Sequence, residues 1–247
     1  MSLMRQRRTL CFTLLTAVVL SLSACSLSGP AGGAKGGSSA NPTKAATAVP
    51  ATTAVYQLMC KSGAAATSVH VVGDYTDNGQ PLQLDVAGDR AGATMRLLVD
   101  FGSGGIEILK VNDDFYLKAG STFWTRLKSV AAAQVAAGKY VKVPSGSAAG
   151  MGEFRVGMLL DQVFARILPS ADELSATVQM SEVDGVPAYL MTTRVAGDAK
   201  IYVSADGQMR LLRTEGAKTG TLTFTQWSSV EPFVVPAQGE RATVPNL

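Results

Sequence analysis

The sequence predicts an α+β fold: one strongly curved antiparallel β-sheet, a half-barrel of about 9–11 strands, with helices covering its concave face. Two observations lead to this prediction. Apolar and polar residues alternate with a period of two in two blocks, residues 68–118 and 176–227, which is typical of strands with one buried face. Before the first block and again between the two blocks, apolar residues recur at helical spacing. A sheet of that width needs helices against one face to bury its apolar side.

A short helix is expected to open the folded domain. Thr52 or Thr53 can serve as its N-cap, and Val55, Leu58 and Met59 fall on one face at helical spacing. Strands then follow as far as residue 118.

The first strand block predicts about five consecutive antiparallel strands. Asn78-Gly79 is a strong signal for a tight hairpin turn, because both residue types accept a positive φ. The expected strands cover residues 69–75, 82–86, 95–101, 106–111 and 115–118.

Two helices and a loop are expected in the middle of the chain. Residues 127–137 are rich in alanine, and residues 158–168 place Leu160 and Phe164 on one apolar stripe. The glycine-rich residues 145–152 between them predict a loop or a lid. The second strand block follows over residues 176–182, 186–193, 200–204, 208–213 and 221–227.

The amino-terminal segment has the layout of a secretory signal. Arg5, Arg7 and Arg8 precede an apolar stretch over residues 10–22, and small residues precede Cys25. Because a helix that spans a bilayer needs about 20 apolar residues, this stretch is too short for a permanent span. Cys25 itself could be a disulfide partner, a metal ligand, a nucleophile or an attachment point.

The segment Leu22-Ser23-Ala24-Cys25 resembles a bacterial lipobox, in which the cysteine is acylated with diacylglycerol and the peptide is cut just before it. The resemblance implies an acyl anchor on the extracytoplasmic face of the cell membrane; a plain cleaved signal is the alternative. The expected organisation is a signal peptide over 1–24, the lipidated Cys25 and a Gly/Ser/Pro/Ala tether over 25–54, a domain over 55–237 and a disordered tail over 238–247.

Charge and cysteine content exclude two classes of protein. The chain has 22 basic and 19 acidic side chains, and the three arginines of the expected signal peptide account for the difference. The mature chain is therefore close to neutral and offers no basic face for nucleic acid. Cys60 is the only cysteine after Cys25, so no intramolecular disulfide is expected in the domain.

Three segments of the sequence, residues 110–118, 124–127 and 138–144, carry a resemblance to a known family. They are similar to segments of the actinobacterial LppX/LprG-type lipoproteins, which are relatives of the LolA and LolB carriers, with Tyr140 at a position where many relatives have tryptophan. The order of elements is similar too: a helix, five strands, two helices and a second set of strands. The resemblance implies a lipid or acylated ligand bound between half-barrel and helices, and its movement across the cell envelope.

The sequence argues against an enzyme. His70 is the only histidine, and no partner residue can be named that would make it a general base. Asp113-Asp114 is a pair of carboxylates, but adjacent acids between two strands are typical of a turn. No nucleophile elbow, phosphate-binding loop or spaced Cys/His set occurs, so we expect no catalytic residue, no cofactor and no metal.

The predicted function is therefore a membrane-anchored lipoprotein that binds a lipid or glycolipid in an apolar cavity, with an envelope membrane protein as a further partner. The alternative is an envelope sensor or interaction protein with the same fold and a core filled by its own side chains. The residues expected to line the cavity are Met95, Leu97, Val99, Phe101, Leu160 and Phe164.

Overall fold

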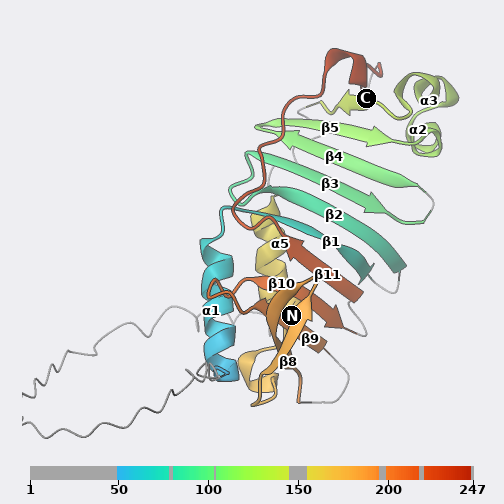
Figure 1. Ribbon diagram of the computed structural model, residues 1–247. Helices are drawn as coiled ribbons and strands as arrows, with labels where there is room; N and C mark the ends of the chain where they lie inside the picture. Colours follow the sequence, from blue (N-terminus) through green and yellow to red (C-terminus); the bar gives the residue numbers. More distant parts are fainter. Residues whose placement is uncertain are drawn as a thin grey trace, which may run out of the picture. The chain divides into compact units, whose positions relative to one another are not determined.

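One twelve-stranded sheet organises the described part of the chain (Figure 1). The computed structural model describes residues 49–77, 80–102, 104–144, 155–194, 199–216 and 220–245. Thr47–Leu247 form one unit, which is described by itself. The predicted fold class, α+β with a curved and open sheet, is confirmed.

The strands of the sheet are mostly antiparallel neighbours in space. They are β1 (Ser68–Asp77), β2 (Gln80–Asp89), β3 (Thr94–Asp100), β4 (Gly105–Val111), β5 (Asp114–Ala119), β6 (Tyr140–Lys142), β7 (Gln179–Val183), β8 (Val186–Thr192), β9 (Ala199–Ser204), β10 (Leu211–Gly216), β11 (Gly220–Thr225) and β12 (Arg241–Ala242). Their order is β12-β6-β5-β4-β3-β2-β1-β11-β10-β9-β8-β7. Only the β12–β6 pair is parallel among these neighbours.

Two groups of helices pack against different parts of the sheet (Figure 1). The first group is α1 (Thr52–Ala65) and α5 (Val156–Gln162), which continues as the π-helix η1 (Val163–Ile167). The second group is α2 (Ser121–Leu127) and α3 (Val130–Ala136), beyond the end of β5. Two short 3₁₀ turns complete the described elements, η2 (Ala171–Glu173) and η3 (Gln238–Glu240).

The main hydrophobic core lies between the first helix group and one face of the sheet, which we call the inner face. Val55 and Met59 of α1 and Leu160 of α5 pack there with strand residues such as Val71 and Val86, all of them buried. A second cluster joins Trp124 of α2 and two alanines of α3 to β5 and β6. Each helix therefore forms because its apolar side chains cover a part of the sheet.

The first helix differs from its prediction in two details. It begins at Thr52 with Ala51 at the N-cap position and no side-chain cap, so neither threonine caps it. Its buried face carries Val55 and Met59 as expected, but Leu58 is exposed. The buried residues of α1, Thr52, Val55, Met59 and Gly63, lie on its side toward the main core, where Gly63 meets Phe164 of η1.

Two further predictions are wrong. The helix expected over 127–137 begins only at Val130, because the Ser129 side chain accepts a hydrogen bond from the Ala132 N–H and caps α3, and Leu127 instead ends the separate helix α2. The disordered tail expected over 238–247 is ordered in its described part, to residue 245. There, β12 pairs with β6, and Val244 is buried in the second cluster.

The outer face of the sheet carries a ladder of charged side chains from β1 to β6. Its contacts are His70 Nε2–Asp85 Oδ1 at 2.9 Å, Arg96–Asp85 at 3.6 Å, Arg96–Glu107 at 3.2 Å and Lys118–Glu107 at 3.8 Å. At its end the Tyr140 hydroxyl donates to Glu107 at 2.6 Å. Burial and this hydrogen bond raise the pKa of Tyr140. The ladder joins neighbouring strands on the face that the helices leave uncovered.

Candidate ligand site

The inner face is apolar beyond the area that α1 and α5 cover. Cross-strand register aligns Val86, Leu97, Ile108, Leu117 and Val141 in one row across β2 to β6. Paired residues of a sheet point to the same side, so this row continues the core toward α2 and α3. Ile108 and Leu117 are only half-buried, whereas the other three are buried. The middle of the inner face is therefore apolar but incompletely covered.

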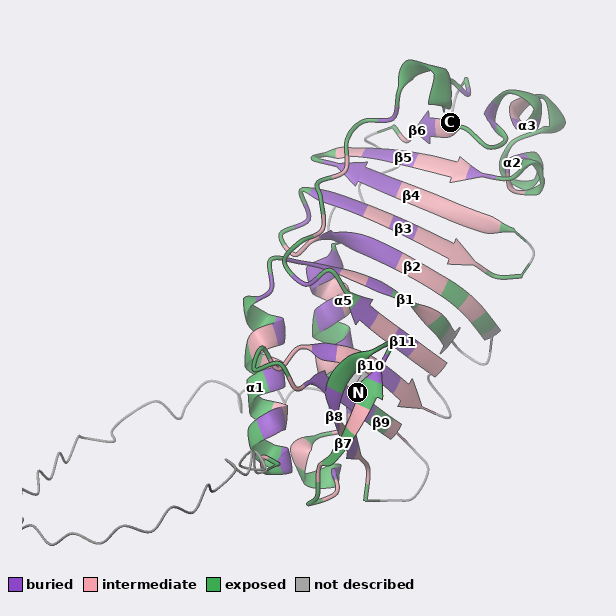
Figure 2. Cartoon of the chain, viewed as in Figure 1, coloured by how far each residue is buried: buried purple, intermediate pink, exposed green. Residues whose placement is uncertain are grey.

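Burial falls toward one end of β3 and β4. Figure 2 shows both strands buried at one end and intermediate at the end that carries the β3–β4 turn. At that end Leu84, Val99 and Ile106 form a second inner row by register, and each is half-buried. An apolar surface that the described helices do not cover is the feature a ligand site requires.

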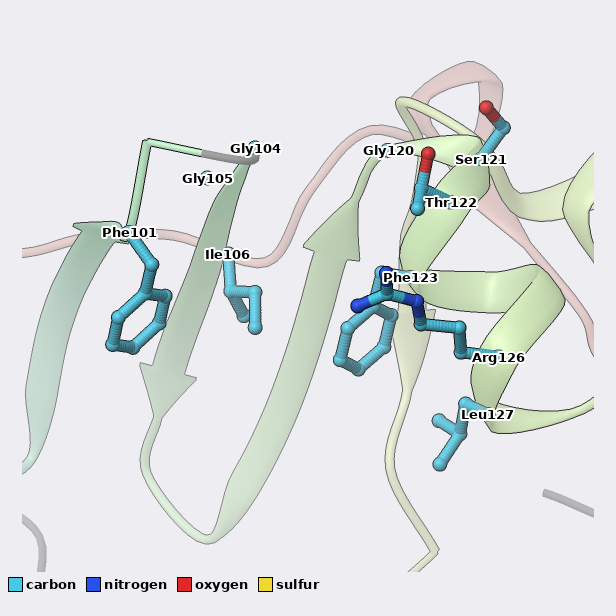
Figure 3. A pocket seen from close by; sticks show the side chains of 10 residues that line it. All are labelled: Phe101, Gly104, Gly105, Ile106, Gly120, Ser121, Thr122, Phe123, Arg126 and Leu127. Atoms are coloured by element: carbon cyan, nitrogen blue, oxygen red, sulfur yellow. The ribbon is translucent and has the colours of Figure 1, made fainter.

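A pocket of about 670 Å³ opens at this end, between the β3–β4 turn and the start of α2 (Figure 3). Its volume lies within the range of about 300–1,000 Å³ that is typical of small-molecule sites. In this turn Gly104 adopts a φ of 125°, which favours glycine, and a Cβ added there would meet no atom within 4 Å. The lining residues are Phe101, Gly104, Gly105, Ile106, Gly120, Ser121, Thr122, Phe123, Arg126 and Leu127.

The pocket combines apolar side chains with a single cation. Phe101, Ile106, Phe123 and Leu127 supply the apolar surface, and Arg126 is the one charged residue among those that line it. Within the described residues no carboxylate lies in salt-bridge distance of Arg126. Its guanidinium can therefore pair with an anionic group of a ligand. Such a site suits an amphiphile, with an apolar part along Ile106 and a polar part near Arg126.

The structure divides the six predicted cavity residues into three groups. Met95, Leu97 and Leu160 are buried in the main core, and Val99 and Phe164 pack half-buried against it. Phe101 alone lines the described pocket, with 53 % of its surface exposed. The β3 residues lie on the inner face as predicted, but most of them contact α1, α5 or neighbouring strands.

The pocket residues that sequence reasoning missed come from β4 and α2. Ile106 was expected in a strand, and Arg126 and Leu127 lie in one of the three segments that carry the family resemblance. Phe123 packs edge-on against the buried Trp124, with ring centroids 5.3 Å apart. The alternation of β4 could have indicated Ile106, whereas nothing in the sequence places α2 beside the β3–β4 turn.

His70 lies on the outer face, away from the pocket. Its Nε2 contacts Asp85, and the Thr225 hydroxyl lies 3.5 Å from its Nδ1. A hydroxyl, an imidazole and a carboxylate are the groups of a hydrolytic triad. Here, however, Asp85 is shared with Arg96 in the ladder, and the hydroxyl contact is at the limit of a hydrogen bond. This arrangement is that of a strand-joining contact.

Three of the predicted features, Cys25, the signal peptide and the loop over 145–152, lie outside the described residues. Cys60 is an unbridged cysteine of α1 and is half-buried. Among the described residues, no group of three or more His, Cys, Asp or Glu side chains could hold a metal ion. None of the described helices is long and apolar enough to cross a membrane.

Comparison with known proteins gives matches among solved structures only. The sequence matches no protein-family model, and no curated protein matches it. The crystal structure of LprF from Mycobacterium bovis matches with 16% sequence identity and a TM-score of 0.46, covering 75% of this chain and 96% of LprF. That of an uncharacterized conserved protein from Thermus thermophilus matches with 11% identity and a TM-score of 0.34, covering 78% of this chain and 98% of that protein. LprF, to which the chain is similar at this level, is a member of the LppX/LprG family that the sequence motifs resemble.

Proposed function

We propose that this protein binds a lipid or another acylated molecule in the pocket at the β3–β4 end of its inner face. The observation that carries the proposal is the continuity of the apolar inner face from the core into a pocket that contains one cation, Arg126. Apolar chains gain about 0.8 kcal/mol for each methylene removed from water, so the affinity of an acyl chain along Ile106 and Phe123 should rise with its length.

The proposal includes the cellular context that the amino-terminal sequence suggests. Cys25 carries the acyl anchor, the residues between Cys25 and the start of α1 at Thr52 form the tether, and the domain works on the extracytoplasmic face of the cell membrane. Its role there is to carry or shield the ligand during transfer across the envelope, and no catalytic step is involved. Substituting Cys25→Ala is expected to move the full chain from the membrane fraction to the medium. Unchanged membrane association would count against acylation.

A second candidate function is supported by the burial of Met95, Leu97 and Leu160. These residues fill the space between the sheet and α5 with the protein's own side chains. A sensor or interaction protein that holds no lipid would have such a filled core. The two candidates differ in whether the remaining pocket takes up an acyl chain.

Dansyl-labelled undecanoic acid is a suitable probe, because its fluorescence rises in an apolar site. We expect it to bind Thr47–Leu247, and Ile106→Asn to weaken binding about tenfold, since an apolar contact worth about 1.4 kcal/mol is lost. Leu98→Asn is the matched control, because Leu98 is also half-buried but points to the outer face. Absence of binding, or equal weakening by both variants, would favour the sensor.

A further inference from the structure

The turn between α2 and α3 exposes apolar side chains to solvent. Arg126 to Val130 are five consecutive exposed residues, and Leu127 and Val130 have 50 % and 62 % of their surface exposed. The apolar residues that hold the two helices to the sheet, such as Trp124 and Ala136, are fully buried. The turn therefore carries apolar surface that packing against the sheet does not use.

The sequence around the turn is positively charged. Residues 115–152 contain five basic and no acidic residues, although the whole chain is nearly balanced. Arg126, Lys128 and Lys139 of this segment are exposed on or beside the helix pair. Lys118 and Lys142 lie on the strands β5 and β6, where they contact Glu107 and Asp114.

The neighbouring element η3 carries one acidic residue, Glu240, next to the β12 strand that packs beside α3. Its carboxylate accepts a hydrogen bond from the Ala237 N–H at 3.0 Å, so it caps its own turn. Among the described residues, no ion pair joins Glu240 to Arg126.

We propose that the α2–α3 turn, Arg126 to Val130, docks the folded unit on a bilayer that contains anionic lipid. Arg126, Leu127 and Lys128 are all exposed at this turn, which therefore offers both cations and apolar surface to the headgroup region. An acidic protein is a poorer occupant. A stable protein interface buries about 1,000 Å² or more, and five residues of a turn offer far less.

The turn is continuous with the pocket, because Arg126 and Leu127 belong to both. Docking would bring the pocket mouth to the lipid surface, where an acyl chain can pass between bilayer and pocket without crossing water. This inference goes beyond the proposed function, since docking needs neither a bound ligand nor the anchor at Cys25. The two proposals can therefore fail separately.

Thr47–Leu247 is the part to test, because it contains every described element and all four hydrophobic clusters but not Cys25. Sedimentation with vesicles of phosphatidylcholine, with and without phosphatidylglycerol, measures docking. We expect binding that depends on phosphatidylglycerol and weakens with salt. Each cation removed near an anionic surface lowers binding about fivefold, so Arg126→Gln with Lys128→Gln should lower it about 25-fold.

Apolar and charged control variants test the position of the contact. Leu127→Ser with Val130→Ser should also lose binding, whereas Val135→Ser, an exposed valine elsewhere on α3, and Lys61→Gln on α1 should not. Equal loss in the control variants, or no preference for phosphatidylglycerol, would overturn the proposal. Ile106→Asn should leave vesicle binding intact while it weakens the dansyl probe.

Discussion

Gly63 in α1 offers a test of how the first helix group covers the sheet. A Cβ added at Gly63 would overlap the Phe164 ring, with Cε2 only 2.7 Å away. Alanine is a better helix former than glycine, so the same substitution in an exposed helix stabilises by about 1 kcal/mol. We predict that Gly63→Ala instead destabilises the protein, because α1 and η1 meet too closely here for a methyl group.

The expected magnitude follows from two opposing effects. Overpacking a filled core costs about 1–3 kcal/mol, and the gain in helix propensity offsets about 1 kcal/mol of it. The helix cannot shift freely, since the Arg90 guanidinium donates to the Gly63 carbonyl at 2.9 Å. The free energy of unfolding should therefore fall by about 1 kcal/mol.

Urea denaturation of Thr47–Leu247 in a double-mutant cycle measures this effect. Phe164→Ala removes the ring, so adding Gly63→Ala in that background should raise the free energy of unfolding by about 1 kcal/mol. The sign of the glycine substitution thus reverses between the two backgrounds. Stabilisation by Gly63→Ala in both backgrounds would show that Phe164 does not fill the space beside α1.

Two further predictions concern stability. Burial tends to raise the pKa of Asp89, but hydrogen bonds from three backbone N–H groups of the β2–β3 turn outweigh it and lower the pKa below 3.8. The carboxylate therefore stabilises the fold above pH 3.8, and this contribution is lost as the pH falls through the lower folded value. Asp89→Asn should lower the free energy of unfolding by about 1–2 kcal/mol at neutral pH, and the variant should lose less stability in acid than the wild type. Denaturation curves taken at several pH values measure both effects. Parallel pH profiles of the two proteins would contradict this prediction. A Cβ at Gly157 would lie 2.6 Å from the carbonyl oxygen of Arg90, which follows β2 and belongs to the backbone, so it cannot rotate away. Gly157→Ala should therefore lower the free energy of unfolding by about 1–3 kcal/mol and lower the Tm. An unchanged Tm would count against a close contact between α5 and the end of β2.

The sequence predicted most strands because alternation directly reflects which face is buried. The row from Val86 through Leu97 to Ile108 is such a pattern, and its register is set by neighbouring antiparallel strands. β12 could not be predicted in this way. It has two residues, and it forms because a distant strand, β6, supplies the pairing. The short helix α2 was missed for a related reason, since seven residues are too few to show helical periodicity.

The sequence predicted which face of the sheet carries the candidate site, but not where along the strands the pocket lies. Alternation places Met95, Leu97, Val99 and Phe101 on one side of β3, and the structure agrees for the strand residues. Which end of that side remains open depends on where α1 and α5 lie, and this is a property of tertiary packing. The sequence therefore indicated Met95, in the core, as readily as Phe101, in the pocket.

The burial of Val244 has a practical consequence for anyone who labels this protein. A purification tag or fluorescent reporter fused at the carboxyl end would follow directly after residues of the Trp124 cluster, such as Val244. Truncating the chain at residue 237 would remove these residues. Either change would affect the packing that holds α2, the helix whose Phe123, Arg126 and Leu127 line the pocket. The β9–β10 turn at Gly207 is a better insertion point, because a side chain there meets open space and the turn belongs to the opposite half of the sheet.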